Sequence, residues 1–341
     1  HNIIKIMTKK HLRYIILIVL SNSIFYVNGQ DFHYSMNQLS PLNLNPALTG
    51  WHKGDIRINS NHRSQWASVS TPFNTYSIST DFTTSKFIPI GILINQDIAG
   101  DSKFSTIQLN LSSSFNLIND SLQQLRIGFQ GGYTSRSIDI NQLSFDAQYN
   151  GSAFDPNLDA NESFNNFKIG YGNINTGLMY VRKLWNNHLI NIQLSCFNLN
   201  RSDQSFMGAT PPIGIDIKFL SKLEHEHLIN NFFKIKTSIF TINQGAHKEL
   251  LIGSQLHYTV ADLFNLKRAL WTGLYYRNKD AFFITAGVIY DAWKLGLSYD
   301  INLSELVPAS QKRGGFEIAL IYLFRKKIKM QSPILICPDY L

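Results

Sequence analysis

Alternation of apolar and polar side chains is the feature that most constrains the fold of this chain. Between Thr106 and Asn116, apolar residues occupy almost every second position, and Ser, Thr, Asn and Gln fill the positions between them. The same period of two recurs over Leu125–Thr134, Ile190–Cys196 and Lys294–Asp300. A period of two is typical of a β-strand with one apolar and one polar face, because successive strand side chains point to opposite sides. The sequence therefore predicts an all-β fold.

Membrane crossing by helices is excluded beyond residue 29. The longest apolar run there is Phe87–Ile94, which has eight residues and contains Pro89 and Gly91. A transmembrane helix needs roughly 20 apolar residues. Strands remain, but a soluble sandwich shows the same alternation with its apolar faces turned inward, so periodicity alone does not choose between the two architectures.

Three further features favour a transmembrane antiparallel β-barrel of about 14 strands over residues 53–324. Aromatic residues make up 13% of the chain and often stand near strand ends, where the membrane interfaces lie. The polar positions are mostly uncharged, which suits a wet lumen. An even number of strands places both ends of the barrel on one side, the periplasm in bacterial barrels. The predicted strands lie near 54–62, 73–82, 87–96, 104–117, 122–136, 168–183, 188–199, 212–221, 231–242, 249–259, 268–277, 281–290, 293–301 and 314–324.

Loop lengths support this order of strands, since bacterial barrels alternate short periplasmic turns with longer extracellular loops. The predicted connections alternate between short and long at most places, and Ser137–Phe167 is the longest. Two connections break the order. Lys222–Asn230 is longer than expected, and Asn278–Asp280 is shorter.

Residues 1–29 have the pattern of a secretory signal peptide whose start is predicted at Met7. Basic residues follow Met7, Tyr14–Leu20 form an apolar stretch, and Val27–Gly29 resembles a small-residue cleavage site. The alternative is a membrane anchor, but the apolar stretch is interrupted at Ser21 and is short for a membrane of about 30 Å.

The net charge of +8 lies mostly at the two ends of the chain. Residues 1–29 carry +4 and residues 325–341 carry +3, which leaves +1 for everything between. A nucleic-acid interface needs a basic face. No nucleic-acid partner is therefore predicted, and residues 325–341 are predicted to be a basic periplasmic tail.

No catalytic, cofactor-binding or metal site is predicted. Glu224–His227 offers two carboxylates and two imidazoles, but they are interpreted as a solvated turn whose neighbouring side chains diverge. Asp97–Asp101 resembles part of a calcium loop and lacks the distal Glu. No G-x-S-x-G motif occurs, and Leu251–Gln255 lacks its second glycine. The two cysteines, Cys196 and Cys337, are too few for a disulfide framework.

Gln30–His52 is predicted to be a periplasmic N-terminal segment made of fixed turns, because Asn and Pro repeat within it. Asn43–Gly50 has three interpretations at this point. It is a turn leading into the first strand, with Gly50 at unusual backbone angles, or a periplasmic docking edge, or a plug inside the lumen.

Several sequence segments resemble the PorP/SprF family of Bacteroidetes outer-membrane proteins, and together they run in order over the chain beyond the signal peptide. They read QDFHYSMNQLSPLNLNPALTG, HRSQW, GILINQDIAGDSKFSTIQLNLSSSF, LRIGFQGGYTSRSIDINQLSFDAQ, LNRSDQSFMG and LGLSYDINLSEL. The resemblance implies an outer-membrane component or accessory of the type IX secretion system, associated in many members with gliding motility and adhesin export. It also implies partners: the translocon or its periplasmic ring, and often one dedicated secreted surface protein.

The resulting hypothesis is a non-enzymatic outer-membrane barrel, surrounded by outer-membrane lipid, with both termini in the periplasm. We expect it to recognise a secreted protein through loops such as Ser137–Phe167 and to dock periplasmic partners. The predicted docking residues are Asn43, Asn45, Pro46, Gly50, Arg63, Gln65, Trp66, Arg325, Lys326 and Lys327. The alternatives are a porin-like channel or small-molecule transporter, and an outer-membrane enzyme.

Overall fold

The computed structural model describes residues 31–67, 71–83, 88–100, 102–139, 143–155, 157–159, 167–185, 187–206, 213–263, 266–304 and 307–325. The chain divides into two units, His1–Asp31 and Phe32–Leu341, and all described residues except Asp31 belong to the second. The predicted signal peptide, Lys326, Lys327 and Cys337 lie outside the described residues.

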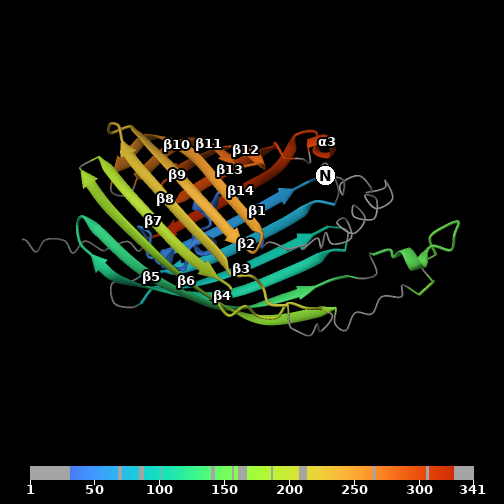
Figure 1. Ribbon diagram of the computed structural model, residues 1–341. Helices are drawn as coiled ribbons and strands as arrows, with labels where there is room; N and C mark the ends of the chain where they lie inside the picture. Colours follow the sequence, from blue (N-terminus) through green and yellow to red (C-terminus); the bar gives the residue numbers. More distant parts are fainter. Residues whose placement is uncertain are drawn as a thin grey trace, which may run out of the picture. The chain divides into compact units, whose positions relative to one another are not determined.

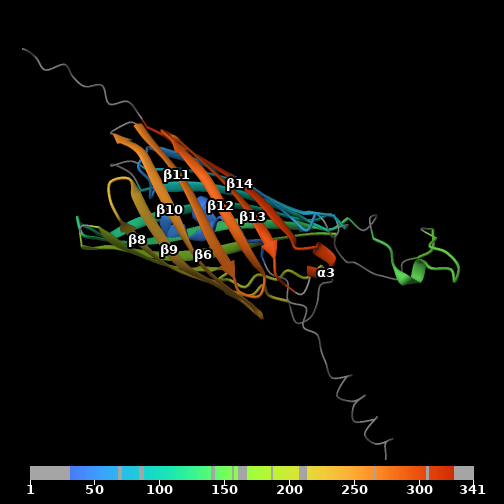
Figure 2. The same ribbon diagram turned by 90° about the horizontal axis from the view of Figure 1, so that it is seen from above.

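Fourteen antiparallel strands close into a barrel in which each strand pairs with its neighbour in sequence and β1 pairs with β14 (Figures 1 and 2). The strands are β1 (Ile56–Gln65), β2 (Phe73–Phe82), β3 (Ile90–Ala99), β4 (Phe104–Asn119), β5 (Gln123–Ser137), β6 (Lys168–Trp185), β7 (His188–Phe197), β8 (Lys218–Leu228), β9 (Phe233–Gln244), β10 (His247–Leu263), β11 (Leu266–Arg277), β12 (Ala281–Tyr290), β13 (Trp293–Asn302) and β14 (Arg313–Phe324).

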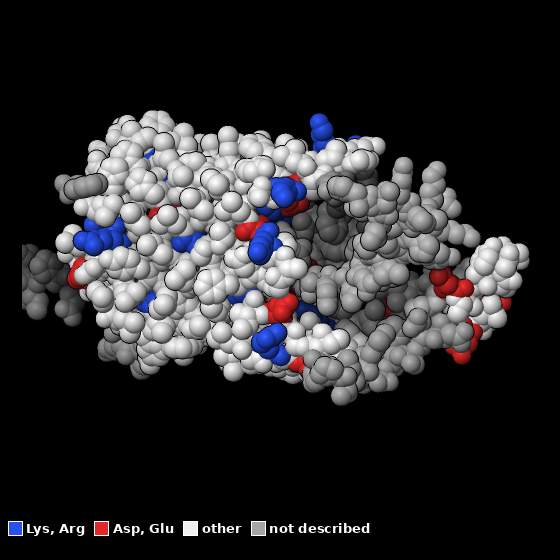
Figure 3. Space-filling view, in the orientation of Figure 1, with Lys and Arg blue, Asp and Glu red and all other residues white. Residues whose placement is uncertain are grey.

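The barrel turns its apolar side chains outward and its polar side chains inward. On β4, Leu109 and Leu111 are 48% and 57% exposed, whereas Asn110 between them and Ser112 beyond them are buried. A soluble sandwich would show the reverse, so this inversion decides the question that periodicity left open. Figure 3 shows the consequence on one face, where the wall is mostly free of charged side chains between its two ends.

Helices are few and short. They are η1 (Asn37–Leu39), α2 (Pro41–Leu44), η2 (Pro46–Leu48), η4 (Asp146–Gln148) and α3 (Val307–Ser310). Within the described ranges, none of the helices has the length and apolar character needed to cross a membrane.

The prediction of fourteen strands is confirmed, and one strand is displaced. A strand was predicted at 212–221, followed by a solvated turn at Lys222–Asn230, but β8 runs Lys218–Leu228. The prediction was wrong because Glu224–His227 lacks apolar residues, although its side chains alternate as a strand requires. The β8–β9 connection is therefore shorter than predicted. As a result, the longer loops lie at one end of the barrel more consistently than the predicted strands implied.

Two ends of the barrel are distinguished below. The long-loop end carries the connections 138–167 and 198–217, and the short-turn end carries 120–122 and 291–292. The start of β1 and the end of β14 both lie at the short-turn end, where the Asp55 amide donates to the carbonyl of Phe324 at 2.9 Å.

Candidate functional site

The lumen holds a segment of the chain itself, Tyr34–Gly50, which we call the lumen segment. All of its residues are buried except Gln38 and Asn43, which are partly buried. Figures 1 and 2 show this blue segment inside the ring of strands in both views. The lumen segment runs from the long-loop end to the short-turn end, where it turns back into β1.

Two arginines and three carboxylates hold the first residues of the lumen segment at the long-loop end. We call Arg63, Arg277, Glu249, Asp300 and Glu317 the arginine–carboxylate cluster. Arg63 lies 2.9 Å from Asp300 and 3.2 Å from Glu317, and Arg277 lies 3.4 Å from both Glu249 and Asp300. Each of these charges has an opposite partner, which offsets the cost of removing it from water.

Ser35 is the residue that inserts into this cluster. Its backbone amide donates to Glu317 at 2.7 Å, and its hydroxyl donates to the Asp300 carboxylate at 2.9 and 3.0 Å. The same hydroxyl oxygen accepts from Arg63 and, at 2.8 Å, from Arg277. Hydrogen bonds to charged groups contribute about 1.5–3 kcal/mol, more than neutral ones.

Asparagines attach the middle of the lumen segment to the barrel wall. Asn43 donates to Ser77 at 3.0 Å and to Asn95 at 3.1 Å. Asn45 donates to the carbonyl of Leu178 at 2.9 Å, while its own side-chain oxygen accepts from the Ala47 amide at 2.8 Å. Asn45 therefore caps η2 and joins it to β6 with one side chain.

Arginines from two strands bind the carbonyl groups at the end of the lumen segment. Arg57 donates to the carbonyl of Leu48 at 2.9 Å, and Arg126 donates to those of Ala47 and Thr49 at 3.1 and 2.8 Å. Asp81, which pairs with Arg57 at 2.7 Å, also accepts from the Gly50 amide at 2.6 Å. Gly50 has φ of +68°, as the sequence predicted, and this turn leads the chain toward β1.

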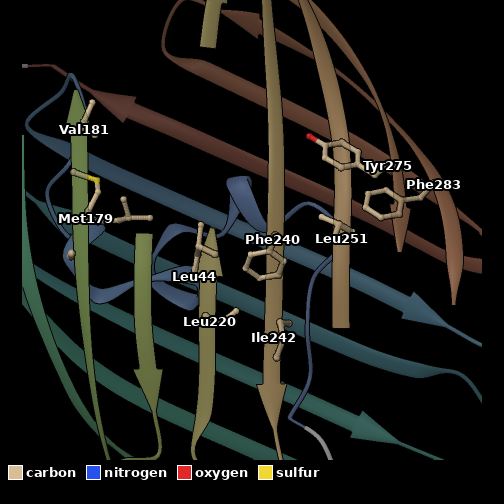
Figure 4. Close-up of a cluster of buried hydrophobic side chains, with 11 residues drawn as sticks. Leu44, Met179, Val181, Leu220, Phe240, Ile242, Leu251, Tyr275 and Phe283 are labelled. Atoms are coloured by element: carbon tan, nitrogen blue, oxygen red, sulfur yellow. The ribbon is translucent and has the colours of Figure 1, made fainter. Parts of the chain in front are cut away.

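The apolar side of the lumen segment packs against inward residues of the strands (Figure 4). Leu44, Ala47 and Leu48 belong to a buried cluster with residues of β6, β8, β9, β10, β11 and β12. Burying a leucine side chain contributes about 1.5–3 kcal/mol. The lumen segment therefore completes an apolar core with the inward apolar residues of β6 and β8–β12.

Two paired glycines let η2 approach the wall. Gly128 on β5 and Gly177 on β6 are partners across the two strands. A Cβ atom on Gly128 would lie 2.2 Å from the Ala47 nitrogen, and one on Gly177 would lie 1.9 Å from the Asn45 side-chain oxygen. No other residue fits at these positions without displacing the lumen segment.

The predicted docking residues do not form one surface. Asn43, Asn45, Pro46 and Gly50 lie in the lumen, so of the three interpretations the structure selects the plug, which also turns into the first strand. A residue buried there cannot contact a partner while the lumen segment stays in place. The others are spread over both ends of the barrel.

The remaining docking residues divide as follows. Arg63 belongs to the buried arginine–carboxylate cluster, whereas Gln65 and Trp66 lie at the long-loop end, where the Trp66 ring centroid is 4.8 Å from that of Phe73. Arg325 lies exposed at the short-turn end and donates to the carbonyl of Lys53 at 2.9 Å. The docking role of these residues stays a prediction.

The described residues of the predicted periplasmic segment Gln30–His52 run between the two ends of the barrel. Lys218, the first residue of β8, donates to the carbonyl of Phe32 at 3.4 Å, which places Phe32 at the long-loop end. The lumen segment thus begins at the opposite end of the barrel from Arg325. An even strand count brings together the first and last strands, but the chain before β1 passes back through the lumen.

Sequence reasoning missed the lumen-facing charges that hold the lumen segment. Arg57, Asp81 and Arg126 each stand at a polar position of an alternating strand, as do Asp300 and Glu317. The sequence did contain a signal for these residues, because a charged residue on the polar face of a barrel strand points into the lumen. Which charges meet across the lumen depends on barrel closure and could not be read from the alternation.

Glu224–His227, interpreted as a turn, alternates across the wall of β8. Glu224 and Glu226 pair with inward lysines, while the His188 ring of β7 stacks on His227 with a centroid distance of 4.2 Å. In the part of the chain that the structure describes, no three His, Cys, Asp or Glu side chains are grouped to hold a metal ion.

A closed barrel with an apolar outer belt and a polar lumen defines an outer-membrane β-barrel protein. The sequence matches the family described as type IX secretion system membrane protein PorP/SprF over residues 27–322, and the chain belongs to this family. A search of curated proteins finds no match.

Solved structures with a similar fold include outer-membrane channels. The TodX monoaromatic hydrocarbon channel deltaS2 mutant has a TM-score of 0.51 and 10% identity over 85% of this chain and 94% of that one. The toluene transporter TbuX of Ralstonia pickettii has a TM-score of 0.49 and 10% identity over 84% and 94%. A FadL homologue of Pseudomonas aeruginosa has a TM-score of 0.46 and 12% identity over 82% and 93%. At these identities the likeness concerns the fold alone.

Proposed function

We propose that this outer-membrane member of the PorP/SprF family acts in type IX secretion by binding protein partners, without catalysis and without conducting small molecules. The observation that carries the proposal is the lumen segment, which is held along its length by side chains from both ends of the barrel wall. A channel needs a continuous path for its solute. A barrel whose lumen contains an anchored segment of its own chain is better suited to a binding scaffold.

The long-loop end is the proposed recognition surface for a secreted surface protein. The 138–167 connection exposes Tyr149 and Phe154, which are 57% and 48% exposed and face each other across an isolated β-bridge. Exposed aromatic side chains are enriched where proteins bind one another. The short-turn end, with Arg325 and the basic tail that follows in the sequence, is the proposed docking side for translocon or ring proteins.

Crosslinking and pull-down of the tagged protein from native outer membranes test this function. We expect recovery of type IX components and of a secreted surface protein, with the latter lost in a Tyr149→Ala, Phe154→Ala double variant that still inserts. Recovery of no type IX component from intact membranes would refute the proposal.

The rival function is a channel or small-molecule transporter. Planar-bilayer conductance of the purified protein separates the two, because the proposal predicts little or no steady conductance for the native chain. Deleting Tyr34–Leu48 should then create conductance if the barrel still closes. Steady conductance of the native protein at the level of its deletion variant would favour the channel.

A further inference from the structure

A second group of charges lies inside the barrel. None of its lysines takes part in the hydrogen bonds of the lumen segment described above. We call Lys222, Lys234, Lys236 and Lys294 the basic cluster. They come from β8, β9 and β13 and surround two carboxylates of β8, Glu224 and Glu226.

The basic cluster has more ammonium groups than its carboxylates can pair. Lys222 lies 2.8 Å from Glu224, and Lys236 and Lys234 lie 2.7 and 3.1 Å from Glu226. Four lysines against two glutamates leave a net charge of +2. Among the described residues, Lys294 has no ion pair within 4.0 Å, but it lies within electrostatic range of Glu224 and of the other three lysines.

Buried hydrogen-bond donors without partners stand beside Lys294 and Lys236. Trp271 is 4% exposed, its ring lies 5.7 Å from the Lys294 ammonium, and its Nε1 has no partner. Gln255, directly opposite Lys236 across β9 and β10, is 5% exposed and its Nε2 also has no partner. A buried donor left unpaired destabilises the fold, because it has lost its hydrogen bond to water. Positive charge and free donors together indicate a site built for an anion.

The basic cluster is accessible from the short-turn end. Lys234 and Lys294 are each the second residue of a strand that begins there. The side chains of Lys234 and Lys236 are 25% and 27% exposed, although strand alternation turns them toward the lumen. A ligand that enters this mouth of the barrel therefore meets Lys234 and Lys236 first.

We propose that the basic cluster binds the carboxylate side chains of an acidic peptide segment that enters the lumen at the short-turn end. Lipid headgroups face the outer wall, whereas these lysines face inward. The ammonium groups are spread over three strands, so several carboxylates spaced along one chain match them better than one small anion. Arg325 at the same end adds to the positive field that would attract such a segment. This inference goes beyond the proposed function, because it requires no type IX component.

Isothermal titration calorimetry on the purified full-length protein in detergent tests the proposal, with hexaglutamate as the probe and hexaglutamine as the neutral control. We expect hexaglutamate alone to bind and to weaken steeply with added salt. Lys294→Gln should weaken binding about tenfold, which corresponds to the loss of about 1.4 kcal/mol of binding free energy. Lys279→Gln, which removes a lysine from the turn at the opposite end, should leave the affinity unchanged.

A second variant separates binding from folding. Glu226→Gln raises the net charge of the cluster, so hexaglutamate should bind more tightly, an outcome that a damaged fold would not produce. Heat-modifiable migration on gels verifies that each variant is a folded barrel. The proposal is overturned if hexaglutamate does not bind, if Glu226→Gln leaves its affinity unchanged or weaker, or if inorganic phosphate or free glutamate binds as tightly as hexaglutamate.

Discussion

Ser35 donates its backbone amide to the Glu317 carboxylate at 2.7 Å, across 282 residues of sequence. This contact joins the first turn of the lumen segment to the last strand of the barrel. The lumen segment can reach Glu317 only when β14 has closed against β1. Barrel closure and filling of the lumen are therefore coupled.

Gly128→Ala should loosen the lumen segment. The added methyl would lie 2.2 Å from the Ala47 nitrogen, and overpacking of this kind costs about 1–3 kcal/mol. Limited proteolysis should cut the lumen segment faster, and urea unfolding in detergent should show a lower free energy of unfolding. Gly131→Ala is the matched control on the same strand, since it is exposed and its Cβ would meet nothing closer than 3.9 Å. Equal effects of the two changes would contradict the close approach of η2 and β5.

Asn45→Ala should weaken the attachment of η2 to β6. It removes the cap on the Ala47 amide and the hydrogen bond to the Leu178 carbonyl, at a cost of about 1–3 kcal/mol. The barrel should still insert, because the strand ladder is intact, while proteolysis of the lumen segment accelerates. Asn278→Ala, at an exposed turn, serves as control. Unchanged protection of the lumen segment would argue against this role of Asn45.

Arg63→Met should be the most damaging single change in the lumen. It removes the arginine that pairs with Glu317 and leaves Asp300 with Arg277, and breaking a buried pair costs about 3–5 kcal/mol. Arg201→Met removes a pair between side chains that are 62% and 39% exposed, and it should cost less than about 1 kcal/mol. Urea unfolding of both variants measures the difference, and similar losses would exclude a buried role for Arg63.

Leu111→Arg tests whether the apolar outer surface of the barrel faces lipid. Leu111 is 57% exposed near the middle of β4, where an arginine facing lipid costs about 2–4 kcal/mol. Leu263→Arg, at the last residue of β10 and 70% exposed, should cost about 0–1 kcal/mol because an interface can hydrate the charge. Folding yield into lipid vesicles distinguishes them, and an equal yield would place the belt elsewhere.

Most of the barrel was predictable from local patterns. Alternation over Thr106–Asn116 and Leu125–Thr134 identified strands, and strands at 13 of the 14 predicted places closely match those observed. Lys222–Leu228 was missed as strand because its outward positions include His225 and His227. These residues form a strand because they pair with β7 and β9, and the alternation of residue types does not reveal that pairing.

The candidate site was predictable only in part. The repeated Asn and Pro of residues 41–50 indicated fixed turns, and Gly50 has the predicted backbone angle. The location of these turns was not predictable, since a turn-rich segment can lie in a loop, on a surface or in a lumen. That both ends of the mature chain share one side of the membrane stays a prediction, because residues 30 and 326–341 lie outside the described ranges.

The sequence by itself determined the kind of wall this protein builds, because strand alternation is a local property that each segment carries alone. It also carried the family, through motifs that run along the chain. Only the tertiary structure decided what the wall encloses. Ser35, Arg63 and Glu317 meet because fourteen strands close into a ring, and the lumen segment fills that ring because the inward charges and paired glycines face it from every side.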